Sequence, residues 1–453
     1  MRRLFGTDGI RGKANQYPMT ADLALKLGQA AAVVFRKRLE KPDNEKVRVV
    51  IGKDTRLSGY VFEYALTSGL CSAGVDVFLV GPMPTPAIAH LTNGFACDVG
   101  IVISASHNPP GDNGIKFFDK DGFKLPDALE EEIEDVMDQP IDTSSVNGTR
   151  VGRAIRIDDA AGRYIEFTKN SIKNMSLAGL KLVLDCANGA AYKVAPPIFR
   201  ELGAEVIVLN NYPNGLNIND NCGALFPETL GKAVLEHKAH LGIALDGDAD
   251  RLIVVDEKGD VVNGDHIMAM CALDMKRRGK LDKDTVVVTV MTNIGFFKAM
   301  AKHGINVVTT QVGDRYVVEE MRNNNYMLGG EQSGHMIFFS RTTTGDGTLS
   351  ALQVLALMKT SGKPMSELAK VMTSYPQTLV GVKVKDKPPI DSLPTVQEKI
   401  SSAETILGSE GRVLVRYSGT SNKCRVMVEA KTQLQADTIA ENISAEIQRV
   451  IGE

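Results

Sequence analysis

The stretch VGIVISASHNP at residues 99–109 decides the fold, because an apolar run ends abruptly in a loop of small polar side chains. Two further stretches have the same form: LGIALDGDADR at 241–251 and YMLGGEQSGH at 326–335, where the apolar part is expected at 326–328. Each apolar run is typical of a buried strand. In open α/β sheets, ligands gather at the carboxyl ends of the strands. Three such ends with complementary side chains predict one shared binding cleft.

Each stretch is the third strand of a repeated unit. The units open with runs rich in β-branched residues, which suit strands buried on both faces of a parallel sheet: 46–52, 180–185 and 285–290. After a helix-length segment comes a strand led by a glycine that fits the cap of the preceding helix: Gly74, Gly203 and Gly304. The repeats predict three related α/β domains with right-handed crossovers and mixed, mostly parallel sheets.

The last part of the chain breaks this pattern. Residues 379–384 are expected to form a strand, 412–415 and 424–429 paired strands, and 394–406 and 433–451 helices. The fold class is therefore α/β, with three related domains and a smaller C-terminal α+β domain around a central cleft. The predicted domains span residues 1–155, 156–255, 256–370 and 371–453. A hinge near 361–376 would make the last domain a lid.

Composition restricts the function classes. The chain has 453 residues, of which 43% are hydrophobic and 24% charged, as in ordinary soluble proteins. Its net charge of −3 gives no general attraction to nucleic acid or to anionic membranes. No segment resembles a secretory signal or approaches the roughly 20 apolar residues of a membrane span. Six cysteines without CxxC pairs indicate reduced thiols, and hence a cytoplasmic protein.

Three aspartates follow the second apolar run. Asp246, Asp248 and Asp250 are two residues apart, so an extended loop can turn all three carboxylates the same way. Such carboxylates repel one another unless a cation neutralises them, and hard oxygen ligands suit Mg²⁺. A calcium-binding EF-hand loop begins with the same D-x-D-x-D pattern, but it requires glycine at its sixth position, where this chain has Arg251. A solvated acidic turn is the alternative, and it is less favoured because the motif ends a buried strand.

Ser106 follows the first run. A serine is a poor nucleophile unless a base or metal activates it, and side chains of neighbours such as His107 usually point apart. No G-x-S-x-G elbow occurs, which argues against an α/β-hydrolase. A serine that carries a phosphoryl group fits better, with Lys116 downstream suited to transition-state charge or proton transfer. Alone, Ser106 would be a plain turn serine; beside Asn108-Pro109 and the aspartates, the functional interpretation is favoured.

Two other segments carry weaker signals. RYSGT at 416–420, with Arg425 beyond it, combines hydroxyls, a glycine and arginines as an anion-binding nest would, although a polar hairpin turn is a fair alternative. FGTDGIRG at 5–12 and GKDTR at 52–56 are ambiguous by themselves. Walker A and G-x-G-x-x-G patterns do not occur, so nucleotide binding has no support.

In this order, the motifs resemble the α-D-phosphohexomutase superfamily, and the resemblance covers essentially the whole chain. Within the superfamily, the chain is most similar to the bacterial phosphoglucosamine mutase branch. Four features carry this similarity: FGTDGIRG at 5–12, NIN at 217–219 with CG at 222–223, VGDRY at 312–316, and Gln332.

The resemblance implies a role for each candidate residue. Ser106 would be a phosphoserine, required for activity. The ligands of one Mg²⁺ would be Ser106, Asp246, Asp248 and Asp250. The sugar hydroxyls would be held by Glu331 and Ser333. The non-reacting phosphate would be held by Arg416, Ser418, Gly419, Thr420 and Arg425. Charge stabilisation and acid/base work would fall to Arg11, Lys116, Arg251 and His335, and the sequence leaves the proton-transfer group open.

The implied reaction interconverts glucosamine 6-phosphate and glucosamine 1-phosphate through a 1,6-bisphosphate, which supplies UDP-N-acetylglucosamine synthesis. The implied partner is therefore a small-molecule hexosamine phosphate, with no nucleic acid and no membrane, and the resemblance suggests a homodimer. A phosphomannomutase or phosphoglucomutase of the same superfamily is the alternative.

One motif departs from the superfamily. Its phosphate loop usually has the sequence Arg-Pro-Ser-Gly-Thr-Glu-Pro, whereas this chain has Tyr417, Ser421 and Asn422 in place of both prolines and the glutamate. Phosphate binding remains an expectation, but the stiffness of the loop and its sugar preference are open.

Two rival functions belong to other classes. A haloacid-type phosphatase would use Asp246 as nucleophile and Asp248 as acid/base, but it should have threonine or valine at 250 and would give Ser106 no task. A non-enzymatic sugar-phosphate sensor would keep the anion nest and tolerate an unphosphorylated Ser106.

Overall fold

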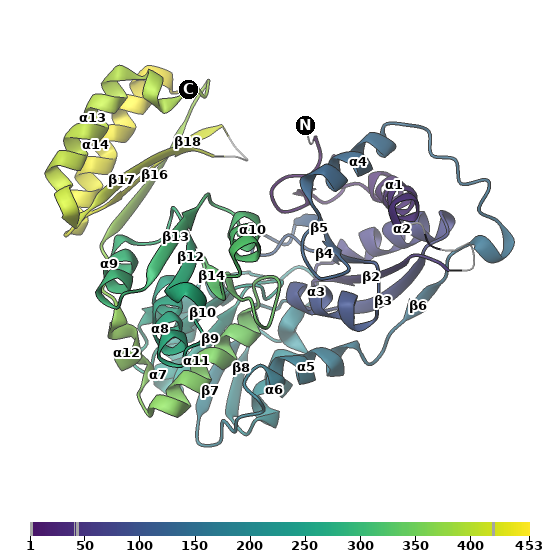
Figure 1. Ribbon diagram of the computed structural model, residues 1–453, viewed down its shortest axis with the longest axis horizontal. Coiled ribbons are helices and arrows are strands. Elements are labelled where there is room, and N and C mark those ends of the chain that lie inside the picture. The colour runs from purple at the N-terminus through teal and green to yellow at the C-terminus, as the bar shows by residue number, and fades with distance from the viewer. Residues whose placement is uncertain (1–2, 40, 42–44, 419–421) are drawn as a thin grey trace. The chain divides into compact units, whose positions relative to one another are not determined.

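The computed structural model describes residues 3–39, 41, 45–418 and 422–453. These residues belong to two compact units. The first unit comprises Met1–Met291 with Ile305–Lys370, and the second unit comprises Thr292–Gly304 with Val371–Glu453. Figure 1 follows the chain through both.

The first sheet has the strand order β1-β5-β4-β2-β3-β6. Its strands are β1 (Ile10–Lys13), β2 (Arg48–Lys53), β3 (Asp76–Pro82), β4 (Val99–Ile103), β5 (Asp112–Asp119) and β6 (Ala154–Arg156). Its helices are α1 (Ala21–Leu39), α2 (Gly59–Ser72), α3 (Thr85–Gly94) and α4 (Asp127–Met137). Helices α1 and α2 lie on one side of the sheet and α3 on the other, so the central strands are buried on both faces (Figure 1).

The next two sheets have the orders β11-β10-β9-β7-β8 and β13-β12-β14-β15. The strands of the first are β7 (Lys181–Asp185), β8 (Glu205–Leu209), β9 (Leu241–Leu245), β10 (Leu252–Val255) and β11 (Val261–Val262). Those of the second are β12 (Thr285–Thr289), β13 (Asn306–Thr310), β14 (Leu328–Gly330) and β15 (Met336–Phe338). The helices of this part of the first unit are α5 (Ala160–Asn170), α6 (Ala195–Glu201), α7 (Pro227–His237), α8 (Gly264–Arg277), α10 (Asp314–Asn324), α11 (Gly347–Ser361) and α12 (Met365–Leu368).

All three sheets repeat one arrangement. The opening strand of each (β2, β7, β12) lies parallel between the other two strands of its repeat. The third strand (β4, β9, β14) then pairs antiparallel with the strand that follows it. The three loops singled out in the sequence join these last two strands, at equivalent corners. The predicted fold class, three related α/β domains with mostly parallel sheets, is confirmed.

Two sequence details have structural outcomes. The glycines that lead the second strands have the left-handed φ expected of helix caps: +87° at Gly74, +96° at Gly203 and +63° at Gly304. The third apolar run was placed two residues too early, since β14 begins at Leu328. Helix α10 ends at Asn324, and Asn325 adopts φ +58° as its C-cap, so the chain becomes extended only after this turn.

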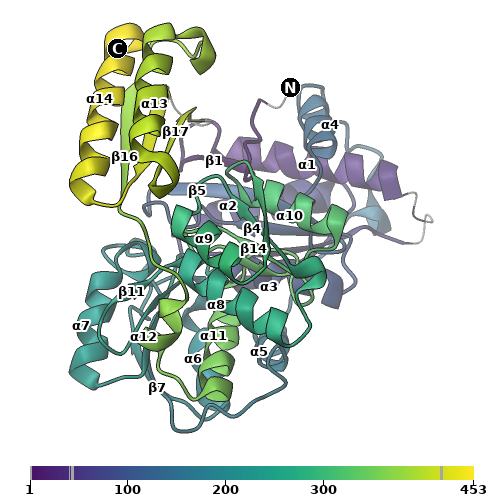
Figure 2. The same ribbon diagram turned by 60° about the vertical axis from the view of Figure 1, so that its left-hand side comes forward.

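The second unit has an antiparallel sheet of order β16-β18-β17, formed by β16 (Gln377–Lys383), β17 (Arg412–Tyr417) and β18 (Lys423–Glu429). Helices α13 (Pro394–Leu407) and α14 (Gln433–Ile451) lie side by side on one face of it (Figure 2). Helix α9 (Ile294–Lys302) belongs to the same unit, where its Ile294 N–H donates to Glu429 Oε2 at 2.9 Å. This unit is the predicted small α+β domain with α9 added.

In the described part of the chain, no helix combines the length and apolarity that crossing a membrane requires. The six cysteines are free thiols, as the sequence predicted.

Candidate active site

Ser106 occupies the loop between β4 and β5. It has φ +52° and is almost fully buried, and its Oγ donates a hydrogen bond to Asp246 Oδ2 at 2.7 Å. The left-handed turn also brings Ser106 Oγ within 3.3 Å of His107 Nδ1, although neighbouring side chains were expected to point apart. Burial, together with the charges of Arg251 and Arg11, lowers the pKa of His107 to about 4, so this imidazole is neutral. His107 was not among the predicted site residues.

The three aspartates form a compact cluster after β9. Asp246, Asp248 and Asp250 are all buried, and one ligand oxygen from each lies within 4.8 Å of the others. Burial and the two neighbouring carboxylates raise the pKa of Asp246 well above its ordinary value. Oδ1 of Asp248 and Oδ1 of Asp250 are buried and accept no hydrogen bond from the described residues. Buried carboxylate oxygens without donors fit a hard divalent cation such as Mg²⁺.

Glycine allows the serine and aspartate loops to meet. A Cβ at Gly247 would lie 2.6 Å from the carbonyl oxygen of Ser106, which is closer than side chains approach. The Gly247 carbonyl accepts a hydrogen bond from Ala190 N at 2.8 Å, so the aspartate loop is fixed from its other side as well. The close contact between Ser106 and Asp246 therefore depends on the absence of a side chain at 247.

Lys116 projects from β5 into the carboxylate cluster. Its Nζ lies 3.0 Å from Asp248 Oδ2, 3.1 Å from Asp8 Oδ2 and 3.9 Å from Asp250 Oδ2. Burial alone would lower the pKa of Lys116, but these carboxylates outweigh it and raise the pKa above its ordinary value. In turn, Lys116 and a 2.7 Å hydrogen bond from Thr85 Oγ1 hold the pKa of Asp248 down against its burial. Lys116 is therefore a fixed positive charge within the carboxylate cluster.

His335 bridges the third loop to the aspartates. Its Nδ1 lies 3.5 Å from Asp250 Oδ1, and its Nε2 accepts a hydrogen bond from Gly345 N at 3.1 Å. Burial lowers the pKa of His335, but Asp250, Asp314 and Glu331 raise it to about 9. The Gly345 bond nevertheless requires a proton-free Nε2, so in this geometry the ring is neutral and its proton sits on Nδ1. A second proton can bind only when that bond opens.

Arg11 and Arg251 add guanidinium groups to the cluster. Arg11, on β1, forms an ion pair with Asp8. The backbone N–H of Arg251 donates a hydrogen bond to Asp246 Oδ1 at 3.1 Å. The Nε atoms of both arginines are buried and have no acceptor among the described residues. Buried cationic donors without acceptors fit an incoming phosphate group.

Glu331 and Ser333 lie in the β14–β15 loop, half-buried. Glu331 Oε1 accepts from Gly313 N at 3.1 Å, and Ser333 Oγ donates to Glu331 Oε2 at 3.3 Å. These bonds orient one carboxylate and one hydroxyl beside His335. Such groups can bind sugar hydroxyls, and all three predicted loops contribute side chains to one region of the first unit.

Sequence reasoning missed the residue that holds the serine loop. Arg56 is fully buried and pairs with Asp54 Oδ2 at 2.8 Å. Its guanidinium also donates to the carbonyl oxygens of Ser106 at 3.0 Å, Asn108 at 2.8 Å and Asp112 at 3.0 Å. The segment GKDTR was noticed but remained ambiguous, because nothing in it reveals that its acceptors lie about fifty residues away.

Ser104 and Asn219 complete this support. Ser104 Oγ donates to Asp54 Oδ2 at 2.7 Å and accepts from Ser106 N at 2.9 Å. Asn219 Nδ2 donates to the Ser106 carbonyl at 2.9 Å. The backbone of Ser106 is thus fixed from three directions before any ligand binds.

Four family models match the chain in succession. They are described as phosphoglucomutase/phosphomannomutase α/β/α domains I, II and III and C-terminal domain, and they match residues 2–143, 162–259, 263–375 and 379–446. The chain belongs to the phosphoglucomutase/phosphomannomutase family. The three related α/β domains and the small fourth domain are therefore features of the family, and so is their order.

Curated members of the family are similar over their full length. A protein of Pelobacter propionicus named phosphoglucosamine mutase is 56% identical over 455 residues, which cover 100% of both chains. Another with this name, from Myxococcus xanthus, is 57% identical over 98% of this chain and 97% of its own. The predicted resemblance to the bacterial phosphoglucosamine mutase branch is confirmed.

Solved structures of the family share the fold. A phosphoglucomutase/phosphomannomutase family protein from Burkholderia thailandensis has a TM-score of 0.79 at 24% identity, over 99% of this chain and 98% of its own. The N-acetylphosphoglucosamine mutase of Aspergillus fumigatus, in complex with GlcNAc-6P and magnesium, has a TM-score of 0.68 at 19% identity, over 99% of this chain and 96% of its own.

The predicted phosphate nest of this family member lies in the second unit. Arg416 and Arg425 face each other across β17 and β18, and both are half-buried. The Ser418 N–H donates to Lys423 O at 2.8 Å, and Lys387 Nζ donates to Ser418 O at 3.0 Å. Gly419 and Thr420, the other predicted phosphate ligands, and the departing Ser421 lie outside the described residues.

The departure at Tyr417 has a structural consequence. Its hydroxyl donates a hydrogen bond to the carbonyl oxygen of Pro388 at 2.7 Å, and Asn422 O accepts one from Val384 N at 3.0 Å. Where the family usually has a proline to stiffen the loop, this chain has a hydrogen bond from Tyr417 to the segment that follows β16.

Proposed function

We propose that the chain is a phosphoglucosamine mutase, which interconverts glucosamine 6-phosphate and glucosamine 1-phosphate with Ser106 as the phosphoryl carrier. The observation that carries the proposal is the 2.7 Å hydrogen bond from Ser106 Oγ to Asp246, inside a buried cluster of three aspartates. A phosphoryl group on this oxygen would lie beside the carboxylates and beside the fixed charge of Lys116. Relatives that carry the enzyme's name at 55–57% identity support the choice of substrate.

The reaction has two transfers that mirror each other. The free hydroxyl of the sugar phosphate attacks phospho-Ser106, the bond from phosphorus to Oγ breaks, and a 1,6-bisphosphate forms. The bisphosphate turns end for end, and its other phosphoryl group returns to Ser106. The proton of the attacking hydroxyl passes to a base at the site, and His335 is a candidate because its Nε2 can take a proton once the bond from Gly345 opens. Neither transfer consumes water, so hydrolysis is a side reaction that the site must prevent.

Asp246, Asp248 and Asp250, together with an oxygen on Ser106, would hold one Mg²⁺. When bound, the ion neutralises charge on the transferring phosphoryl group. Lys116, Arg11 and Arg251 hold positive charge around the same group throughout the reaction. Glu331 and Ser333 would orient the sugar by its hydroxyls.

The second unit would bind the phosphate that does not react, through Arg416, Ser418, Gly419, Thr420 and Arg425. We propose that residues 371–453 act as a lid, hinged near 361–376, that excludes water during transfer. The domain boundaries after residues 155, 255 and 370 stay predictions. So do a homodimeric state, a cytoplasmic location and the absence of nucleic-acid and membrane partners.

The deciding experiment is the substitution Ser106→Ala. We expect the loss of nearly all turnover, on the order of 10³-fold or more, because no hydroxyl remains to carry phosphate. Intact-mass measurement should find one added phosphate on the parent protein and none on the variant. Ser145→Ala, an exposed serine in a loop of the first unit, is the matched control and should behave as the parent. Unchanged activity in Ser106→Ala would falsify the proposal.

A coupled assay with glucosamine, glucose and mannose phosphates tests the substrate separately. A higher kcat/KM for the glucosamine compounds is expected. The opposite ranking would make the chain a phosphomannomutase or phosphoglucomutase of the same family and would leave the mechanism intact. Release of inorganic phosphate instead of the isomeric sugar phosphate would indicate a haloacid-type phosphatase. If the phosphorylated parent protein showed no turnover at all, the result would indicate a sugar-phosphate sensor.

A further inference from the structure

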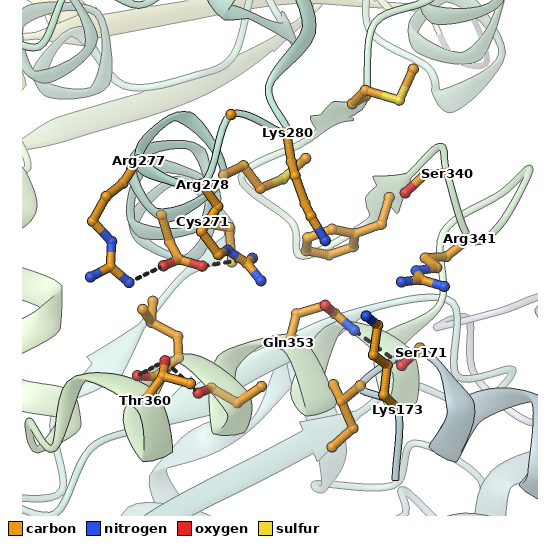
Figure 3. Close-up of a pocket in the computed structure, with 18 of the residues that line it drawn as sticks. Ser171, Lys173, Cys271, Arg277, Arg278, Lys280, Ser340, Arg341, Gln353 and Thr360 are labelled. Atoms are coloured by element: carbon orange, nitrogen blue, oxygen red, sulfur yellow. Dashed lines mark hydrogen bonds and ion pairs between the residues drawn. The ribbon is translucent and has the colours of Figure 1, made fainter. Parts of the chain in front are cut away.

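A large cavity lies in the first unit, away from the Ser106 loop. Its volume is about 700 Å³, within the range of roughly 300–1,000 Å³ that is usual for small-molecule sites. Five segments line it: the turn after α5, the end of α8 with the turn that follows, Met327 just before β14, the end of β15, and one face of α11. None of the predicted site residues belongs to it (Figure 3).

Positive charge dominates the lining. Five cationic side chains and two carboxylates line the cavity, which leaves an excess of three positive charges: Lys173, Arg277, Arg278, Lys280 and Arg341 against Asp274 and Asp282. Asp274 binds both Arg277, at 2.8 Å, and Arg278, at 2.6 Å, so these two arginines share one carboxylate.

The other three cations have no partner. The side chains of Lys173, Lys280 and Arg341 make no ion pair or hydrogen bond with any residue that the structure describes. In Figure 3, Lys280 and Lys173 point toward each other from opposite sides of the hollow, and Arg341 enters from a third side. All three are exposed at the edge of the hollow, and without carboxylate partners they make its potential positive, which favours an anion there.

The floor of the cavity is apolar. Cys271, Met275 and Phe338 are buried in it. Burial raises the pKa of the Cys271 thiol to about 12, so the cysteine adds no negative charge. On the α11 side, Gln353 Nε2 is engaged with Ser171 Oγ at 3.0 Å. The cavity therefore combines a cationic rim with an uncharged, largely hydrocarbon and aromatic base.

Helix ends explain only some of these cations. Basic residues commonly stabilise the carboxyl end of a helix, and Arg277 and Arg278 at the end of α8 fit that role. Lys280 does not, because Gly279 turns the chain with φ +63° and the Lys280 N–H bonds back to Met275 O at 2.8 Å. This turn directs the lysine into the cavity. Lys173 and Arg341 likewise follow the ends of their elements instead of lying within them.

We propose that this cavity binds a small organic phosphate with an apolar group. Lys173, Lys280 and Arg341 contact the anionic head, and Met275 and Phe338 contact the apolar body. The site is separate from the proposed phosphoryl-transfer site and does not depend on its assignment.

The test uses 1-anilinonaphthalene-8-sulfonate, an aromatic anion of matching chemistry, with fluorescence titration of the full chain. The triple variant Lys173→Gln, Lys280→Gln, Arg341→Gln should bind the probe at least tenfold more weakly than the parent. A matched control, Lys120→Gln, Arg153→Gln, Lys232→Gln, removes the same charges from exposed positions elsewhere in the first unit and should change the Kd less than twofold. Equal binding by the two triple variants overturns the proposal.

A second variant separates the cavity from its charges. Ala356→Phe, on the face of α11 that lines the cavity, puts a ring into the space and removes no cation. It should also weaken probe binding at least tenfold, and unchanged binding would mean that the anion lies outside the cavity. In competition, phenyl phosphate should displace the probe from the parent at lower concentration than inorganic phosphate. Equal displacement by both would overturn the role of the apolar floor.

Discussion

The two regions proposed to bind phosphate differ in burial and in how their backbone is held. The Ser106 loop is buried, and its backbone is held by Arg56, Ser104 and Asn219. The β17–β18 hairpin of the second unit instead presents two half-buried arginines, Arg416 and Arg425, on facing strands. A group that transfers phosphate must be positioned before reaction, because a misplaced oxygen costs rate. A group that only binds the distant phosphate can adapt to either end of a substrate that reverses. Substitutions in the first region should therefore reduce kcat, and those in the second should raise KM.

The largest effect after the loss of Ser106 itself is expected from Asp248→Asn. The change removes one carboxylate of the proposed metal site and half of the closest ion pair of Lys116. We expect kcat to fall about 10³-fold, the order lost with a main electrostatic group of a transfer site. Calorimetric titration should show weaker Mg²⁺ binding. The control is Asp220→Asn, an exposed aspartate of the same unit. Parent-like Mg²⁺ affinity in Asp248→Asn would remove this residue from the metal site.

Arg56→Lys tests whether the serine loop must be held. Lysine keeps the charge beside Asp54 but cannot reach the carbonyls of Ser106, Asn108 and Asp112 together, because its donors radiate from one atom. We expect about 3 kcal/mol lower stability in urea unfolding, because buried polar partners lose their bonds. A kcat about 10²-fold lower should accompany it, with KM nearly unchanged.

Arg163→Lys is the matched control for this change. Arg163 forms an exposed ion pair with Asp159 at 2.8 Å, and such pairs contribute less than about 1 kcal/mol. If Arg56→Lys loses stability and its kcat remains that of the parent, the loop is structural only, and the contrast between the two regions fails.

Arg425→Gln probes the second region. Removing one guanidinium from the hairpin should raise KM about tenfold, the loss of one charge-assisted contact to phosphate. The kcat should fall less than threefold, because this phosphate does not react. Steady-state kinetics with glucosamine 1-phosphate separates the two constants. A fall in kcat larger than the rise in KM would show that both regions act on the transferred group.

The smallest effect is expected from Tyr417→Phe. It removes the 2.7 Å hydrogen bond to Pro388 O that stands where the family usually has a stiffening proline. The loss of this bond should lower the free energy of unfolding of the second unit by about 1 kcal/mol and raise KM two- to threefold. Tyr212→Phe, whose ring is 88% exposed, is the control. No change in either measurement would mean that the hydrogen bond does not replace the proline.

Much of the fold could be predicted because it depends on local sequence. Strands buried on both faces must be continuous apolar runs, so β2, β7 and β12 were evident, and helix caps need left-handed residues, so Gly74, Gly203 and Gly304 marked the second strands. The helix from Gln433 to Ile451 was predicted to the residue. The start of β14 was not predicted to the residue, because no fixed sequence pattern marks the left-handed turn at Asn325.

The site divides in the same way. The spacing of Asp246, Asp248 and Asp250 predicted a cation site by itself, because an extended loop can turn carboxylates two residues apart to the same side, and the three do lie together. Three features appear only in the folded chain: Ser106 donates to Asp246, Gly247 leaves room for this contact, and Arg56 holds the serine loop. A sequence carries the chemistry of each loop, but the distance between two loops is set by how whole domains pack. Contacts between residues 50 or 140 positions apart therefore appear only in three dimensions.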